Sequence, residues 1–190
     1  MTKLALGVLL WSIVHFVPAV AVDFRNSMVR RLGEYPWKGL FALVMALALY
    51  LIITGWKSAV ATEIFMPPAW GGHAAYVLVW AGFVLFLAPY PANNFKRLLR
   101  HPQLTGVCLW GVGHLAANGD ARSILLFGGL TLWAVIEGLL LNRRDGEWQK
   151  PDKVSHMRDL ALLLFSTLVY MAFIYTHHMI FGGSPLTWTQ

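Results

Sequence analysis

The chain has 190 residues, of which 57% are apolar and 13% charged, and its formal net charge is +6. This balance excludes an ordinary soluble globular domain and predicts an integral membrane protein surrounded by a lipid bilayer. The lone cysteine, Cys108, excludes an intramolecular disulfide.

Six apolar segments follow one another along the chain, and each approaches the roughly 20 residues that a helix needs to cross a bilayer. They cover residues 4–22, 37–56, 71–90, 102–118, 121–141 and 158–181. No linker, low-complexity stretch or internal repeat divides them. We therefore predict an all-α fold, a polytopic transmembrane helix bundle of about six spans that forms a single domain over residues 1–190.

The first apolar segment resembles a cleavable signal peptide, since a single basic residue, Lys3, precedes it. More positive charge follows the segment, at Arg25, Arg30 and Arg31. That charge distribution favours an anchor inserted with its N-terminus outward. We expect the segment to be retained as the first span.

Basic residues gather in the connections after the first, third and fifth spans. These are Arg25, Arg30, Arg31, Lys38, Lys96, Arg97, Arg100, Arg143, Arg144, Lys150, Lys153 and Arg158, whereas Lys3, Lys57 and Arg122 fall on the other side. By the positive-inside rule the crowded side is cytoplasmic, which places both termini on the non-cytoplasmic side. The net charge therefore reports topology, and nucleic-acid binding is not expected.

Tryptophans lie near the predicted span ends, where an indole keeps its ring in lipid and its N–H in water. These interfacial anchors are Trp37, Trp56, Trp70, Trp148 and Trp188.

The fourth and fifth spans are joined so tightly that we expect an antiparallel helix hairpin. Asn118 and Gly119 tolerate the left-handed conformation that ends many helices, and Asp120 suits the N-cap of the next helix. Pro102 suits the first helical turn, which leaves His101 at the helix start. Small side chains along this hairpin predict close helix packing, with Gly128 and Gly129 as candidates to face Gly106, Gly113 and Ala117.

Histidines within membrane spans are costly to bury, so they are the first candidates for a functional site. His101 and His114 are thirteen residues apart, which is roughly 20 Å of helical rise, so they cannot share one metal ion. A metal partner for His114 must come from another helix. His15, His73 and the adjacent pair His177 and His178 are available, and predicted depth favours the pair on the sixth span.

A simpler reading of the buried histidines is open as well. His15 and His114 could each bond to a backbone carbonyl or to a hydroxyl such as that of Ser12. Glu137, a carboxylate well inside a span, is expected to pair with Arg143 or Arg144, or else to orient a histidine. An apolar setting suppresses thiolate formation, so Cys108 is interpreted as a packing residue.

The fourth span carries a recognisable pattern. Residues 100–120 read R-H-P-Q-L-T-G-V-x-L-W-x-x-x-H-L-x-A-N-G-D and are followed by L-L-F-G-G at 125–129. This pattern resembles the signature of the NnrU family, small polytopic membrane proteins of bacteria related to 15-cis-zeta-carotene isomerase. His15 with Pro18, and R-x-L-G-E-Y-P-W-K-G-L-F-A-L at 30–43, are similar to the family pattern too. The resemblance covers essentially the whole chain.

The resemblance implies a haem b group bound within the bundle by histidine. In the isomerase branch the histidines that match His15, His101 and His114 are tied to activity. Carried over, His15 and His114 become the axial iron ligands, which also makes them the metal ligands of this chain. His101 becomes a functional or structural residue on the cytoplasmic side. Because motifs are sharper than span boundaries, we follow the resemblance rather than the depth argument for His177 and His178.

Three functions follow as hypotheses. The first is a haem-binding protein of the bacterial inner membrane, accessory or redox-sensing in nitrite and nitric oxide respiration. The second is a haem-dependent cis-trans isomerase of a carotenoid or other isoprenoid polyene, with that apolar molecule as ligand. The third is a bundle without cofactor. One departure weakens the second, because the isomerase branch has a cysteine three residues before the histidine of this motif, where this chain has Gly111.

Overall fold

Apolar helices account for most of the chain, and the all-α prediction is confirmed. The computed structural model describes residues 1–181, so the predicted anchor Trp188 lies outside the described residues. The helices are α1 (Thr2–Val20), α2 (Val22–Leu32), α3 (Glu34–Ser58), α4 (Gly71–Leu87), α5 (Phe95–Leu98), α6 (Pro102–Ala117), α7 (Ala121–Ser123), the π-helix η1 (Ile124–Gly128), α8 (Gly129–Asp145) and α9 (His156–Phe181).

Four stretches are long and apolar enough to cross a membrane. They are Thr2–Val20, Glu34–Ser58, the continuous helix Ala121–Asp145 and His156–Met179, and the 17-residue α4 is a shorter apolar helix. Large apolar side chains stay exposed along them, as on α9, where Leu164 is 60% and Leu168 is 70% exposed. Such surfaces suit lipid rather than water. The chain is therefore a multi-pass membrane protein, while the number of spans and their orientation stay predictions.

Every predicted span coincides with a helix, but the first predicted loop is itself helical. Helix α2 has Asp23 in its first turn and Arg30 and Arg31 in its last, a distribution that suits the helix dipole. Gly33 ends the helix with φ +91°, a conformation that glycine adopts readily. The order of charges along residues 22–32 therefore favours a short polar helix, where the sequence analysis expected only a connection.

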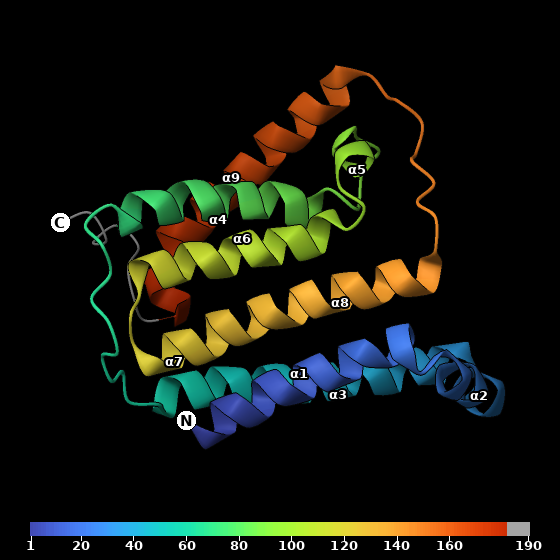
Figure 1. Cartoon of the computed structure of the whole chain (residues 1–190), viewed down its shortest axis with the longest axis horizontal. Helices are drawn as coiled ribbons and strands as arrows, with labels where there is room; N and C mark the ends of the chain where they lie inside the picture. Colours follow the sequence, from blue (N-terminus) through green and yellow to red (C-terminus); the bar gives the residue numbers. More distant parts are fainter. Residues whose placement is uncertain (182–190) are drawn as a thin grey trace.

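The helices form layers that Figure 1 shows from the side. Helices α1 and α3 pack together along one edge, α8 lies beside α1, and α6 and α4 follow on the other side of α8. Helix α9 crosses α4 obliquely, held by a bond from Trp80 Nε1 to Thr167 Oγ1 of 2.9 Å. Helix α8 thus contacts both the α1–α3 pair and the α4–α6 pair.

Glycines bring α4 and α6 to backbone contact. A Cβ atom at Gly106 would lie 2.6 Å from the carbonyl oxygen of Gly82, and one at Gly82 would lie 2.9 Å from that of Gly106. The prediction of close packing is right, but most partners differ: Gly106 and Gly113 face α4, and Gly129 faces Val8 of α1. Gly128 does lie across the hairpin, opposite Leu115 of α6. The spacing of small residues along a helix shows on which face they lie, but not which neighbouring helix packs against that face.

The α6–α8 hairpin and the Asp120 cap are confirmed, because Asp120 Oδ1 accepts from the backbone N–H groups of Arg122 and Ser123. The left-handed turn is wrong. Asn118 is extended, and Gly33 and Gly146 are the positive-φ residues of the described chain. The Gly119 carbonyl instead accepts from Ile64 and Phe65 of the α3–α4 connection, which therefore closes this end of the hairpin.

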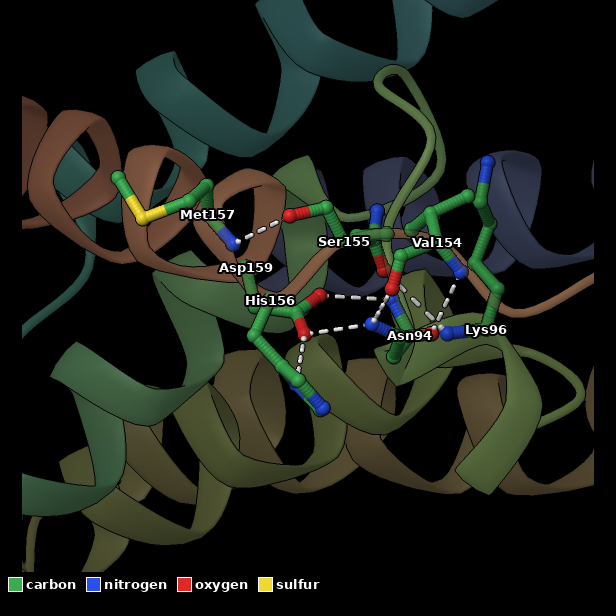
Figure 2. A network of polar contacts seen from close by, with 8 residues as sticks. Asn94, Lys96, Val154, Ser155, His156, Met157 and Asp159 are labelled. Atoms are coloured by element: carbon green, nitrogen blue, oxygen red, sulfur yellow. Dashed lines mark hydrogen bonds and ion pairs between the residues drawn. The ribbon is translucent and has the colours of Figure 1, made fainter.

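A polar network fixes the start of α9 to the α4–α6 connection, as Figure 2 shows. The Asp159 carboxylate accepts from the Asn94 backbone N–H and from Asn94 Nδ2, each at 2.7 Å. The Asn94 side chain also exchanges two bonds with the backbone of Val154. Two segments 65 positions apart are thereby held together by one carboxylate and one amide.

Replacing Gly106 by alanine is expected to destabilise the bundle, because the new methyl group meets the backbone of α4 and overpacking costs about 1–3 kcal/mol. Thermal unfolding in detergent measures the change. Gly39→Ala is the matched control, since nothing lies within 4 Å of a Cβ at that position. Equal melting temperatures for the two variants would contradict the packing described.

Replacing Asp159 by alanine is expected to release the start of α9, because the Asn94 N–H and amide lose their acceptor at a cost of about 1–3 kcal/mol. Limited proteolysis should then cut faster within residues 146–155. Asp152→Ala, in the same exposed connection, serves as the control. Unchanged cleavage in the Asp159 variant would show that the network does not hold α9.

Candidate functional site

His114 lies near the end of α6 and is only 7% exposed. Its Nδ1 is 2.8 Å from the carbonyl oxygen of Trp110. A carbonyl oxygen only accepts, so Nδ1 carries the proton and Nε2 carries the lone pair. Phe127 stacks on the imidazole, with ring centroids 4.3 Å apart and planes 18° apart.

Phe127 belongs to the π-helix η1, which widens the helix between α7 and α8. Such single-turn insertions are common at functional sites, because they redirect side chains out of the regular helical order. Here the redirected ring covers one face of His114, and it also meets Trp56 and Trp110 at centroid distances of 5.7 and 4.8 Å.

His15 repeats this arrangement on α1. Its Nδ1 is 2.9 Å from the carbonyl oxygen of Trp11, which again leaves the lone pair on Nε2. The imidazole is half-buried and lies 4.5 Å from the Trp11 ring and 4.8 Å from the Trp133 ring. The sequence analysis allowed a backbone carbonyl as the partner of each buried histidine, and this partner is found in both cases.

Five aromatic residues lie in two groups around the imidazoles. Trp11 and Trp133 contact His15, whereas Trp110 and Phe127 contact His114 and Trp56 meets Phe127. We refer to them as the aromatic cluster: Trp11, Trp56, Trp110, Phe127 and Trp133. They come from α1, α3, α6, η1 and α8, so the cluster lies where both helix pairs meet the long helix. Each histidine has a cluster member four residues before it, the spacing that places two side chains on one helical face. That spacing was the available signal, and the sequence analysis did not use it.

The structure brings His15 and His114 to the same cluster but not to each other. His15 packs on Trp133, whereas His114 stacks on Phe127, six positions earlier on the same continuous helix. Six residues correspond to roughly 9 Å of rise, while two nitrogens on one metal lie about 4 Å apart. Their joint ligation of one iron stays a prediction.

The other histidines occupy different surroundings. His177 on α9 is half-buried and close enough to His114 to act on it electrostatically, while His73 and His178 are exposed. His101 lies at the start of α6, where its Nε2 is 3.1 Å from Asn142 Oδ1 and so joins α6 to α8. Among the described residues no group of three or more His, Cys, Asp or Glu side chains is arranged to hold a metal ion.

Glu137 differs from expectation, because it does not pair with either arginine. Arg144 instead donates from Nε to Asp145 at 2.6 Å and from an Nη to the carbonyl oxygen of Pro18 at 3.0 Å. Glu137 is 6% exposed, and no described residue bonds its Oε2 atom. Both bonds of Arg144 are made at its own end of α8. Glu137 lies about two helical turns earlier on the same helix and bonds neither arginine.

These contacts describe two imidazoles whose ring orientation is fixed and whose lone pairs lie on Nε2. A carbonyl bond at Nδ1 is the usual way in which proteins orient a metal-ligating histidine. The aromatic walls exclude water and offer flat apolar faces. The site therefore offers oriented imidazole nitrogens bordered by aromatic rings.

The sequence profile of the family described as NnrU protein matches residues 3–185. The chain belongs to the NnrU family. The match covers α1, α6 and α8, and so includes His15, His101, His114 and the aromatic cluster of this NnrU-family chain. The same comparisons find no match among curated proteins or among solved structures.

Gly111 is the position at which the sequence analysis expected a difference from the isomerase branch. A Cβ atom there would meet Thr131 Oγ1 and lie 2.8 Å from the carbonyl oxygen of Phe127. The packing of α6 on η1 and α8 therefore leaves no room for a cysteine at this position. Cys108 does not substitute for it, since its thiol lies 3.9 Å from the carbonyl oxygen of Thr131.

Gly111→Cys is therefore expected to destabilise the bundle by about 1–3 kcal/mol or more, because a side chain is forced into the α6–α8 contact. Thermal unfolding in detergent measures the loss. Adding Thr131→Ala should recover only part of it, since the Phe127 carbonyl oxygen still blocks the new Cβ. Gly39→Cys is the matched control, because it adds the same side chain where nothing lies within 4 Å of a Cβ. A fully stable Gly111→Cys variant would show that α6 and α8 separate easily.

Proposed function

We propose that this NnrU-family chain binds haem b within the bundle, with His114 and His15 as the ligands that α6 and α1 contribute. The observation that carries the proposal is the shared geometry of the two imidazoles. Each donates Nδ1–H to the carbonyl four residues earlier and so carries its lone pair on Nε2. Aromatic rings border both.

The residues present fit the chemistry of a haem more closely than that of a bare metal ion. Neutral imidazoles are the commonest protein ligands of haem iron, and a macrocycle needs the flat apolar walls that the aromatic cluster supplies. Bare divalent ions need more ligands of the His, Cys, Asp or Glu type, and the described residues offer no such group.

The separation of His15 and His114 limits whether both can bind one iron. The residues of α8 that the two imidazoles contact, Trp133 and Phe127, are separated by roughly 9 Å of rise, so ligation of one iron by both would need their nitrogens closer than these contacts suggest. His177 is the competing second partner, because it lies within electrostatic reach of His114. The resemblance favours His15 and proximity favours His177, so the two must be separated by experiment.

Haem iron supplies reversible one-electron chemistry and a site for small ligands such as nitric oxide. The biological role that we propose follows the family resemblance: an accessory or redox-sensing protein of nitrite and nitric oxide respiration in the bacterial inner membrane. The polyene isomerase is the competing role. No specific contact favours it, and this chain has Gly111 where the resemblance places the cysteine of that branch.

The absorbance spectrum of the purified chain tests the proposal. After expression with adequate haem, a Soret band that shifts on reduction is expected. His114→Ala should abolish or strongly alter the band, because it removes the more deeply buried ligand. His15→Ala should convert a six-coordinate, low-spin iron into a five-coordinate, high-spin one.

The exposed His73→Ala is the control and should leave the spectrum unchanged. If His177→Ala rather than His15→Ala changes the spin state, the second ligand comes from α9. Lack of any Soret band in the wild-type chain would leave the bundle without cofactor and would end both the haem and the isomerase hypotheses.

A further inference from the structure

Three buried polar atoms at one helix interface have no hydrogen-bond partner among the described residues. They are Glu137 Oε2 and Trp133 Nε1 on α8, and Trp11 Nε1 on α1. Glu137 and Trp133 are 6% and 7% exposed, so neither group can reach solvent. Buried polar atoms normally find partners, above all in a bilayer where water is absent. Three exceptions at one place therefore call for an explanation.

The three groups share one face of the α1–α8 interface. Trp133 and Glu137 are four positions apart on α8, the spacing that places their Cβ atoms about 5–6 Å from each other. The ring of Trp11 meets that of Trp133 edge-on at 5.8 Å. The carboxylate acceptor and the Trp133 indole therefore lie on the same side of α8, the side on which the Trp11 ring meets Trp133.

The other polar groups near this face already have hydrogen-bond partners of their own. Arg144, the nearest basic group on α8, is bonded to Asp145 and to the Pro18 carbonyl oxygen. His15 lies against both tryptophans, but its Nδ1–H is used by the Trp11 carbonyl oxygen and its Nε2 accepts from neither indole N–H. The carboxylate and the two indoles thus remain as a polar group within an otherwise apolar and aromatic wall.

The donors and acceptors of these three residues determine which ligand group could satisfy them. An indole N–H needs an acceptor, whereas a carboxylate oxygen needs a donor. A hydroxyl group is both, so a single hydroxyl oxygen can accept from an indole N–H and donate to Glu137. A pure hydrocarbon offers neither and would leave all three atoms unpaired.

We propose that the interface of α1 and α8 is a binding site for an apolar, membrane-soluble molecule that carries a hydroxyl group, either a phenol such as a quinol or an isoprenoid alcohol. Its hydroxyl bonds Glu137 Oε2 and the indole N–H groups of Trp133 and Trp11, and its apolar body lies along the α1–α8 interface beside these two rings. The site selects against hydrocarbon polyenes. This inference does not depend on haem binding.

Titration of the full-length chain in detergent with a short-tailed benzoquinol tests the proposal. The chain carries ¹⁵N-labelled tryptophan, and the Trp133 and Trp11 indole signals are assigned with Trp133→Phe and Trp11→Phe. Both N–H signals are expected to shift on binding. The dimethyl ether of the same quinol, which lacks O–H donors, is the matched ligand and should bind roughly tenfold more weakly.

A second arm uses farnesol, an isoprenoid alcohol, and distinguishes the two sources of the hydroxyl. Tighter binding of the benzoquinol assigns the site to phenols, and tighter binding of farnesol assigns it to aliphatic alcohols. In either case Glu137→Leu should weaken the preferred ligand roughly tenfold. Glu147→Leu, an exposed carboxylate in the connection after α8, should leave the affinity unchanged.

Folding of the Glu137→Leu variant is checked by its melting temperature, which is expected to equal or exceed that of the parent chain because an unpaired buried carboxylate is removed. Unshifted indole signals with both hydroxyl ligands overturn the proposal. So does equal affinity for the benzoquinol and its dimethyl ether.

Discussion

The hydrocarbon core of a membrane offers no hydrogen bonds, so each polar group inside this bundle must find its partner within the protein. Most do so locally. His15 and His114 bond the carbonyl oxygens of Trp11 and Trp110, and Asp120 caps the helix that follows it. Several buried polar atoms have no hydrogen-bond partner among the described residues, and three of them, Glu137 Oε2 and the Nε1 atoms of Trp11 and Trp133, belong to the α1–α8 region.

Helix α8 brings the two histidine-bearing helices together. It lies between the α1–α3 pair and the α4–α6 pair, so it carries contacts from both histidine-bearing helices. The π-helix at its start turns Phe127 onto His114, while Trp133 further along meets His15. Position along this one helix therefore sets the separation of the two imidazoles, and any cofactor or ligand between them has to fit that spacing.

Local features were predictable because they depend on neighbouring residues. Pro102 begins a helix, Asp120 caps one, and the apolar segments became helices with small shifts at their ends. Features that depend on a partner from elsewhere were not. Gly106 and Gly113 of α6 face α4 instead of α8, Asn118 is extended because the α3–α4 connection bonds Gly119, and Arg144 bonds Asp145 and Pro18 instead of Glu137.

The sequence by itself determined the membrane environment, the helical class, the family and the identity of the candidate histidines, since composition and motif carry these without any contact. Only the tertiary structure decided which side chains meet. It placed His15 and His114 at different heights of one aromatic cluster, filled the space beside Gly111, and gathered Glu137 with two indoles. The reason is that helical spacing fixes the face on which a residue lies, whereas the neighbour on that face depends on how the helices pack.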